Sequence, residues 1–99
     1  MEYLVDMVTS VPDGTSEEVV ADMRTREAAR SRELAEQGHL LRLWRPPLGP
    51  GEWRTWGLFQ ADSEGQLQAT LASMPLHVWR RDTVTPLSPH PNDPALRGQ

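Results

Sequence analysis

Cysteine and lysine are both absent from the 99 residues of this chain. The absence of cysteine excludes disulfides, thiolate nucleophiles and cysteine-ligated metal sites, and it favours a cytoplasmic protein. The absence of lysine means that all ten basic side chains are arginines, which excludes catalysis through a side-chain Schiff base. The available chemistry therefore rests on carboxylates, arginines, histidines and hydroxyl groups.

Long apolar runs and an excess of positive charge are also missing. No segment approaches about 18 apolar residues and the first residues carry no signal-peptide pattern, so neither a membrane span nor export is expected. The net charge of −4 gives no electrostatic basis for binding nucleic acid or an anionic membrane. We expect a soluble cytoplasmic protein.

Metal-ligand spacing is absent as well. His39, His77 and His90 form no H-x-H or H-x-x-x-H pattern, so no metal site is expected. Ser31 has no accompanying His–Asp pattern, and a nucleophilic serine is not expected either.

Residues 16–38 predict a long helix with one unusual residue. Thr15 or Ser16 is expected to cap its start, Thr15 through a capping box with Glu18, and Gly38 is expected to end it. Glu27 stands in the middle of the stripe that should be buried, which also carries Val20, Met23, Ser31 and Leu34. A carboxylate on a buried face is costly unless it is paired or protonated, so Glu27 requires an explanation.

Two interpretations of Glu27 are open from the helix pattern alone. In the first, it is a structural ion pair with Arg24 or Arg30, each within one turn of it. In the second, it is a catalytic base in a partly dry cleft. The pattern alone favours the structural interpretation, since structural pairs produce the same arrangement.

Alternation of apolar and polar residues predicts four strands around this helix. They are expected at 2–11, 39–45 and 53–61, and within 76–87. A second helix is expected from the N-cap Ser63 to Pro75. This order predicts an α+β, ferredoxin-like βαββαβ fold over residues 1–87, with two helices on one face of a four-stranded antiparallel sheet. Residues 88–99 are expected to form a Pro-rich C-terminal arm.

The free face of the predicted sheet needs a cover. Four tryptophans accompany a single phenylalanine and a single tyrosine, and a short chain buries only a thin core. We therefore expect a homo-oligomer in which a second subunit or the arm lies over this face.

Three motifs, in this order, resemble the muconolactone Δ-isomerase family. The first is a charged helix that contains Glu27 and ends in Glu36-Gln37-Gly38. The second is Leu43-Trp44-Arg45. The third is Met74-Pro75-Leu76, followed by a strand and a tail with His90-Pro91. The motifs are short, and the resemblance rests on their order and spacing over nearly the whole chain.

The resemblance implies a homo-oligomer, decameric in the best-known members, with its site between subunits. It implies a cofactor-independent isomerase that shifts a proton and a double bond in muconolactone or a related unsaturated lactone acid, within β-ketoadipate-type aromatic catabolism. Glu27 matches the family's helix glutamate, the base, and Arg24 stands where relatives can have lysine. Trp44 and Arg45 match a Trp-Arg pair, and His90 matches a histidine of the tail. Glu27 as base, Arg24 or Arg45 as clamp for the substrate carboxylate, and Trp44 as pocket wall form a chemically sufficient set.

The chain departs from the family pattern in three places, the first of which is the arginine at position 24 in place of lysine. The loop 46–51 is longer and richer in proline and glycine than expected. His77, Trp79 and the pair Arg80-Arg81 stand where a more apolar strand opening is usual. Taken on its own, Arg80-Arg81 is expected to be solvated, with one residue on each face of a strand.

Two alternative functions stay open at this point. One is a cyclase or a cofactor-free oxygenase of the dimeric α+β barrel type, for which the tryptophans would suit a larger aromatic substrate. The other is a non-catalytic oligomer that binds a small acid. The surroundings of Glu27 distinguish an enzyme from the non-catalytic alternative, and the pocket volume distinguishes the two kinds of enzyme.

Overall fold

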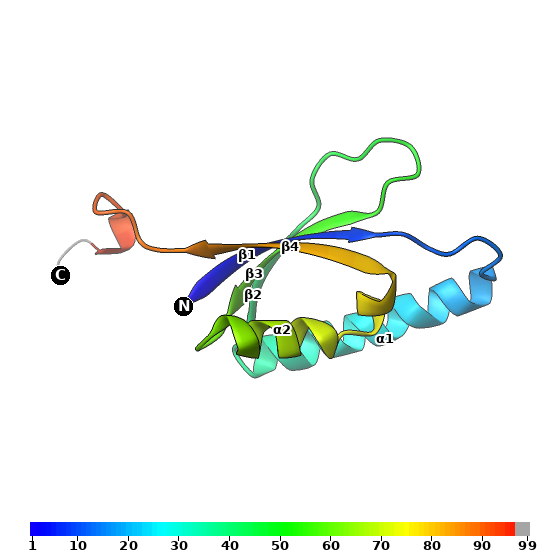
Figure 1. Ribbon diagram of the computed structural model, residues 1–99, viewed down its shortest axis with the longest axis horizontal. Coiled ribbons are helices and arrows are strands. Elements are labelled where there is room, and N and C mark those ends of the chain that lie inside the picture. Colours follow the sequence, from blue (N-terminus) through cyan, green and yellow to red (C-terminus); the bar gives the residue numbers. More distant parts are fainter. Residues whose placement is uncertain (97–99) are drawn as a thin grey trace.

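The computed structural model describes residues 1–96 and contains four strands, two α-helices and two short 3₁₀ helices (Figure 1). In chain order these are β1 (Glu2–Thr9), α1 (Glu17–Glu36), β2 (Leu40–Trp44), β3 (Arg54–Gln60), α2 (Glu64–Ala72), η1 (Pro75–Trp79), β4 (Arg80–Leu87) and η2 (Pro94–Leu96). The predicted βαββαβ order is confirmed.

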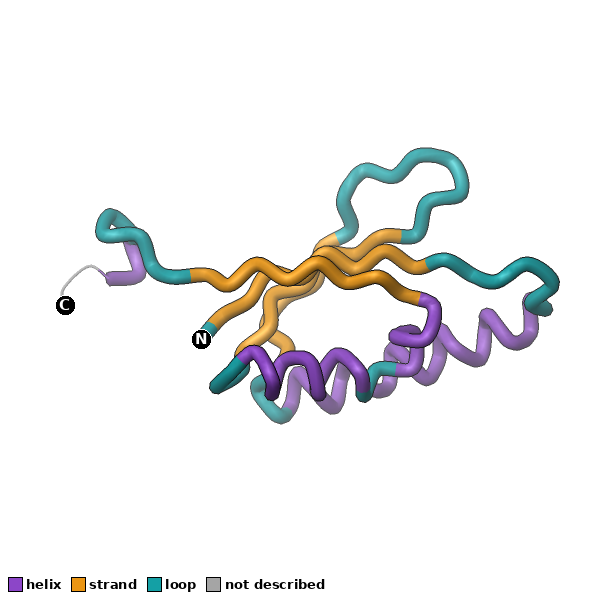
Figure 2. The backbone as a smooth tube through the Cα atoms, viewed as in Figure 1, coloured by secondary structure: helices purple, strands orange, loops and turns teal. Residues whose placement is uncertain are grey.

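The strands form one antiparallel sheet in the order β2-β3-β1-β4, as a ferredoxin-like fold requires. Both helices lie on the same side of this sheet (Figures 1 and 2). The central strand β1 alternates buried and partly exposed residues, because one face meets the helices and the other does not. The fold prediction is therefore correct.

The core lies between the helices and the inner face of the sheet. Phe59, Leu34, Leu67, Leu71 and Val5 are its largest fully buried side chains. On α1, Met23 and Leu34 are buried, while Glu27 and Ser31 between them are only partly exposed. The stripe predicted on this helix is the face that packs against the rest of the chain.

The start of α1 has one of the two predicted N-caps but not the predicted capping box. Ser16 is the N-cap, and its Oγ accepts a hydrogen bond of 3.2 Å from the Val19 N–H. Thr15 instead donates through its hydroxyl to the Pro12 carbonyl, 2.6 Å away. The preceding turn engages the Thr15 side chain, so the cap moves one residue further on.

The fourth strand is shorter than the predicted window. Residues Pro75–Trp79 form η1, and β4 begins only at Arg80. Pro75 occupies the first turn of η1, where its fixed φ and missing N–H are tolerated. This turn carries the chain from α2 back to the sheet and places Leu76 beside α1.

A β-bulge in β2 changes which residues face the core. The pairing shifts between Leu40 and Arg42, so Leu40 lies opposite Phe59 and is buried. Strict alternation would have put Leu40 on the face of Arg42 and Trp44. After the bulge, Trp44 pairs with Trp56, and both are exposed on the outer face of the sheet.

Beyond Leu87 the chain leaves the sheet as an arm that ends in η2 (Figures 1 and 2). The last residues of the predicted arm, 97–99, lie outside the described part of the chain. Within residues 1–96, neither α-helix combines the length and the hydropathy needed to span a bilayer.

Candidate active site

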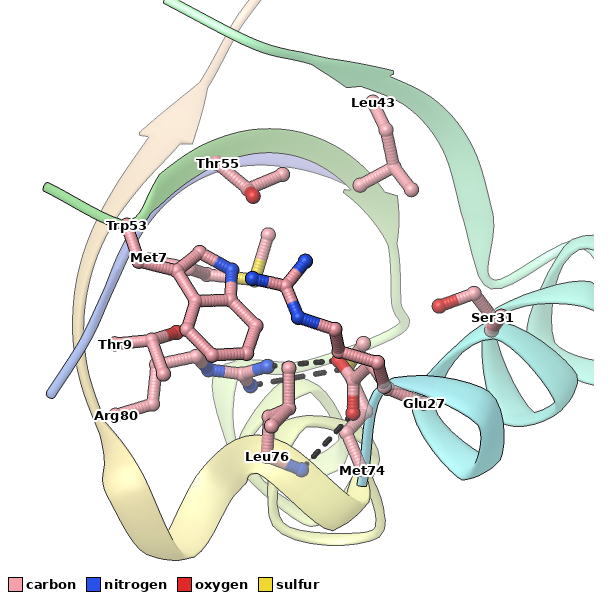
Figure 3. Close-up of a pocket in the computed structure, with 12 residues that line it drawn as sticks. Met7, Thr9, Glu27, Ser31, Leu43, Trp53, Thr55, Met74, Leu76 and Arg80 are labelled. Atoms are coloured by element: carbon pink, nitrogen blue, oxygen red, sulfur yellow. Dashed lines mark hydrogen bonds and ion pairs between the residues drawn. The ribbon is translucent and has the colours of Figure 1, made fainter. Parts of the chain in front are cut away.

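A cavity of about 220 Å³ lies between the inner face of the sheet, α1 and η1. Figure 3 shows how its lining side chains converge from these elements. They are Met7, Thr9, Arg24, Glu27, Ala28, Ser31, Leu43, Trp53, Thr55, Met74, Leu76 and Arg80. Pockets for drug-sized molecules run to about 300–1,000 Å³, so this cavity suits a smaller ligand.

Glu27 points from α1 into this cavity with both carboxylate oxygens engaged (Figure 3). Its Oε1 accepts a hydrogen bond of 3.0 Å from the Leu76 main-chain N–H. Its Oε2 accepts one of 3.2 Å from Arg80 Nη1. The side chain is 15% exposed, so the carboxylate reaches the cavity while protein donors fix its direction. Each oxygen keeps a further lone pair that a ligand can approach.

Arg80 is the most buried charged group at the site, with a side chain that is 2% exposed. Its Nε and Nη2 donate to the two Asp82 oxygens at 2.7 and 3.0 Å, a bidentate pair. The sheet register explains why both face inward: Arg80 lies opposite Thr9 and Asp82 opposite Met7, both of which are buried. Glu27, Arg80 and Asp82 therefore form one charged cluster beside the cavity.

Arg24 also lines the cavity, from a position one helical turn before Glu27 on α1. Its guanidinium carbon lies 4.1 Å from the centroid of the Trp53 ring, a cation–π arrangement. Arg24 is exposed, and the stacking on Trp53 keeps its guanidinium group near the cavity. A planar guanidinium in this position is suited to a carboxylate ligand.

The rest of the lining is mixed in polarity. Met7, Leu43, Met74 and Leu76 supply apolar contacts, and Thr9, Ser31 and Thr55 bring hydroxyl groups (Figure 3). Such a lining accommodates a small molecule with a carbon framework and several oxygens.

The ion-pair partners expected for Glu27 were wrong. Neither Arg24 nor Arg30 pairs with it; Arg30 donates to Ser73 Oγ at 3.0 Å and lies 3.7 Å from Glu33. The expectation that Arg80-Arg81 is solvated was wrong for Arg80, which is buried, while Arg81 is exposed. The difference arises because successive residues of β4 point to opposite faces of the sheet.

The predicted site residues fall into two groups. Glu27 and Arg24 line the same cavity. Trp44 and Arg45 border a separate hollow with Pro46, Pro47 and Trp56, and His90 lies in the arm, where its Nδ1 accepts from the Asn92 N–H. One chain thus does not bring Trp44, Arg45 or His90 to Glu27, and their substrate-binding roles stay predictions.

Sequence reasoning did not identify Trp53, Arg80 and Asp82 as site residues. One signal was present: Arg80 and Asp82 share a strand face with Val84, so an opposite-charge pair lies next to an inward-facing apolar residue. Within residues 1–96, no cluster of three or more His, Asp or Glu side chains has an arrangement that could hold a metal ion.

Comparisons with known proteins find relatives that match nearly the whole chain. Residues 1–93 match the family model described as muconolactone delta-isomerase. Muconolactone Delta-isomerase 1 of Acinetobacter lwoffii is 32% identical over 92 residues, which cover 93% of each protein. Muconolactone Delta-isomerase of Cupriavidus pinatubonensis is 30% identical over 93% of this chain and 97% of that protein.

Two solved structures share the fold. A crystal structure of muconolactone isomerase aligns with a TM-score of 0.83 and 24% identity, over 94% of both chains. The 5-chloro-2-hydroxyhydroquinone dehydrochlorinase of Burkholderia phenoliruptrix, in complex with 2,5-dihydroxybenzoquinone, aligns with a TM-score of 0.66 and 16% identity, over 94% of this chain and 99% of that one. Together with the sequence matches, the shared fold shows that the chain belongs to the muconolactone Δ-isomerase family, a family of intramolecular isomerases.

Proposed function

We propose that this protein isomerises muconolactone or a closely related unsaturated lactone acid, without a cofactor, and that Glu27 is the base. The relatives in Acinetobacter and Cupriavidus carry the name muconolactone Delta-isomerase, which suggests the substrate class. The observation that carries the proposal is the position of Glu27, a carboxylate held at the wall of a small cavity by two fixed donors.

The proposed reaction is a proton transfer with no net change in composition. Glu27 takes a proton from a carbon whose acidity comes from conjugation with the lactone carbonyl. The electron pair left behind spreads into a dienolate, and the carboxylic acid of Glu27 returns the proton to another carbon of that system. One carboxylate serves both steps, because the base that gains a proton in the first step is the acid that gives one back in the second.

Arg24 is the group we assign to the substrate carboxylate. It lines the cavity with Glu27, and its stacking on Trp53 orients the guanidinium plane. A planar fork of N–H donors binds a carboxylate in a defined direction, which would place the carbon framework against the apolar part of the lining.

A homo-oligomer also belongs to this proposal. Trp44 and Trp56 form a cross-strand pair on the outer face of the sheet, and they are 38% and 40% exposed in the single chain. Apolar aromatic side chains at this level of exposure favour a surface that a second subunit covers.

The direct test is proton NMR of the protein with muconolactone in D₂O. Wild-type protein should convert the lactone or exchange its proton for deuterium. Glu27→Gln should reduce the rate by about 10²- to 10⁴-fold, the usual contribution of a general base. Glu36→Gln, on the exposed end of the same helix, is the matched control and should keep the wild-type rate. Full activity of Glu27→Gln would remove Glu27 from the mechanism.

A further inference from the structure

The charged cluster of Glu27, Arg80 and Asp82 has a geometry that a simple ion pair does not require. Arg80 donates to Glu27 through one terminal nitrogen and to Asp82 through its other edge, so a single planar group connects two carboxylates. All three side chains are largely buried, at 15%, 2% and 9% exposed for Glu27, Arg80 and Asp82.

We infer that Arg80 is a positioning residue that sets the orientation of the Glu27 carboxylate, and that Asp82 in turn fixes Arg80. The inference rests on the proposed role of Glu27 as the base. Arg80 acts on the reaction through Glu27, and it needs no direct contact with the substrate.

The hydrogen bonds define how this positioning works. A carboxylate held through one oxygen can still rotate about its last side-chain bond. Glu27 is held through both: the Leu76 N–H lies on Oε1 and Arg80 Nη1 on Oε2, and these donors come from different elements. Two donors on two oxygens fix the plane of the carboxylate, and with it the direction of the lone pairs that face the cavity.

Asp82 makes Arg80 a rigid donor. The bidentate pair occupies Nε and Nη2, and Nη2 also lies 3.7 Å from Met74 Sδ. With these nitrogens engaged, the guanidinium cannot turn to follow a displaced Glu27. A lysine ammonium would place the same charge nearby without the planar fork, so charge and positioning can be separated by mutation.

The main test compares three variants with wild-type protein in steady-state kinetics with muconolactone. The double variant Arg80→Met/Asp82→Leu removes the clamp without leaving Asp82 buried and unpaired, and Glu27 keeps its hydrogen bond from the Leu76 N–H. We expect kcat to fall by about 10- to 100-fold, as for a misplaced catalytic group, with KM nearly unchanged. The kcat of Arg80→Lys should be close to that of the double variant. The exposed neighbour provides the control, and Arg81→Met should keep the kcat and KM of wild-type protein.

A readout without substrate separates this inference from the proposed function. In protein labelled with ¹³C at glutamate carboxyls, Glu27→Gln identifies the Glu27 signal. The double variant and Arg80→Lys should move that signal, whereas Arg81→Met should leave it in place. If wild-type protein does not act on the lactone, the proposed function fails, and the carboxyl signal in Arg80→Lys, which keeps the charge, decides whether the guanidinium fork orients Glu27.

Three results would overturn the inference. The first is an unchanged Glu27 signal in the double variant. The second is a moved signal with an unchanged kcat, which would make the cluster structural only. The third is recovery of wild-type kcat in Arg80→Lys, which would show that the charge is sufficient and the fork is not needed.

Discussion

Two arginines border the cavity, and their surroundings give them different chemical uses. Arg80 is buried and donates to Glu27 and Asp82, whereas Arg24 is exposed and stacked on Trp53. A buried, fully engaged guanidinium is suited to holding a neighbour in place. An exposed guanidinium can exchange solvent for the carboxylate of a ligand.

Arg24→Met should therefore weaken substrate binding more than it slows the chemical step. A hydrogen bond to a charged group contributes about 1.5–3 kcal/mol, so KM should rise roughly 10- to 100-fold while kcat changes little. Steady-state kinetics with the lactone measures both values. Arg32→Met, an exposed arginine two turns further along the same helix, is the control. An unchanged KM in Arg24→Met would exclude Arg24 as the carboxylate clamp.

On the outer face of the sheet, Asp6 and Arg54 form a bidentate ion pair, with 2.8 Å between Arg54 Nε and Asp6 Oδ1. The hydrogen bond from Arg54 holds the pKa of the Asp6 carboxyl below its usual value. Because folding lowers this pKa, the pair stabilises the folded state fully above about pH 4, near the ordinary aspartate pKa. That stabilisation disappears as the pH falls further, through the folded-state pKa.

Asp6→Asn should accordingly lower the free energy of unfolding at pH 7, and the difference from wild type should shrink as the pH falls below about 4. Urea denaturation at pH 7 and at pH 3 measures this difference. Asp13→Asn, in the exposed turn before α1, should show no such narrowing. A difference for Asp6→Asn that stays constant with pH would contradict the assigned effect of Arg54.

Sequence could predict a site residue only where the pattern that reveals it lies within a single helix or strand. Glu27 stands out on a helical wheel, because a carboxylate in an apolar stripe is visible from spacing alone. Its partner Arg80 lies 53 positions away in the sequence, and helix spacing offered only Arg24 and Arg30. Which strand residue meets a helix depends on sheet register and on where η1 ends, and neither follows from local pattern.

The type and the order of the helices and strands could be predicted better than the residues at which they begin and end. Period-2 alternation and turn residues located the strands. The bulge that buries Leu40 and the turn that delays β4 to Arg80 are tertiary features, set by pairing with β3 and by the path from α2. The cap of α1 depended on a hydrogen bond from Thr15 to Pro12, which competes with the predicted capping box.

At the start of α1, Ser16→Ala should lower the free energy of unfolding by about 0.5–2 kcal/mol, because the Val19 N–H loses its side-chain acceptor. Chemical denaturation followed by far-UV circular dichroism measures the change. Ser88→Ala, an exposed serine in the arm, is the control and should have little effect. A loss as large in Ser88→Ala would show that the Ser16 cap is not the cause.

The two faces of the sheet differ in how much of the chain packs over them. The helices protect the inner face of the sheet, while the outer face carries Trp44 and Trp56 and the arm extends beyond Leu87 (Figure 1). The topology of one chain could be predicted from sequence because each helix and strand has its own local pattern of apolar and polar residues. The proposed homo-oligomer would cover the outer face through contacts between chains, and such contacts leave no periodic signal in the sequence.

Truncation after Ser88 leaves β4 complete and removes the arm. If the arm lies on a neighbouring subunit, the mass of the assembly in light scattering should fall, and activity should fall with it. His90→Ala in the full-length chain separates the two effects, since it should lower activity and leave the mass unchanged. An unchanged mass and unchanged activity after truncation would show that the arm has no role in either.

The Leu76 N–H that holds Glu27 has a consequence for how the site can change in evolution. Every residue except proline supplies this donor, so position 76 can accept different side chains, and reshape the wall of the cavity, without releasing Glu27, the proposed base. Mutations at 76 can therefore alter which ligand fits the cavity while the orientation of the Glu27 carboxylate is retained. Position 80 has no such freedom, because there the donor belongs to the side chain itself.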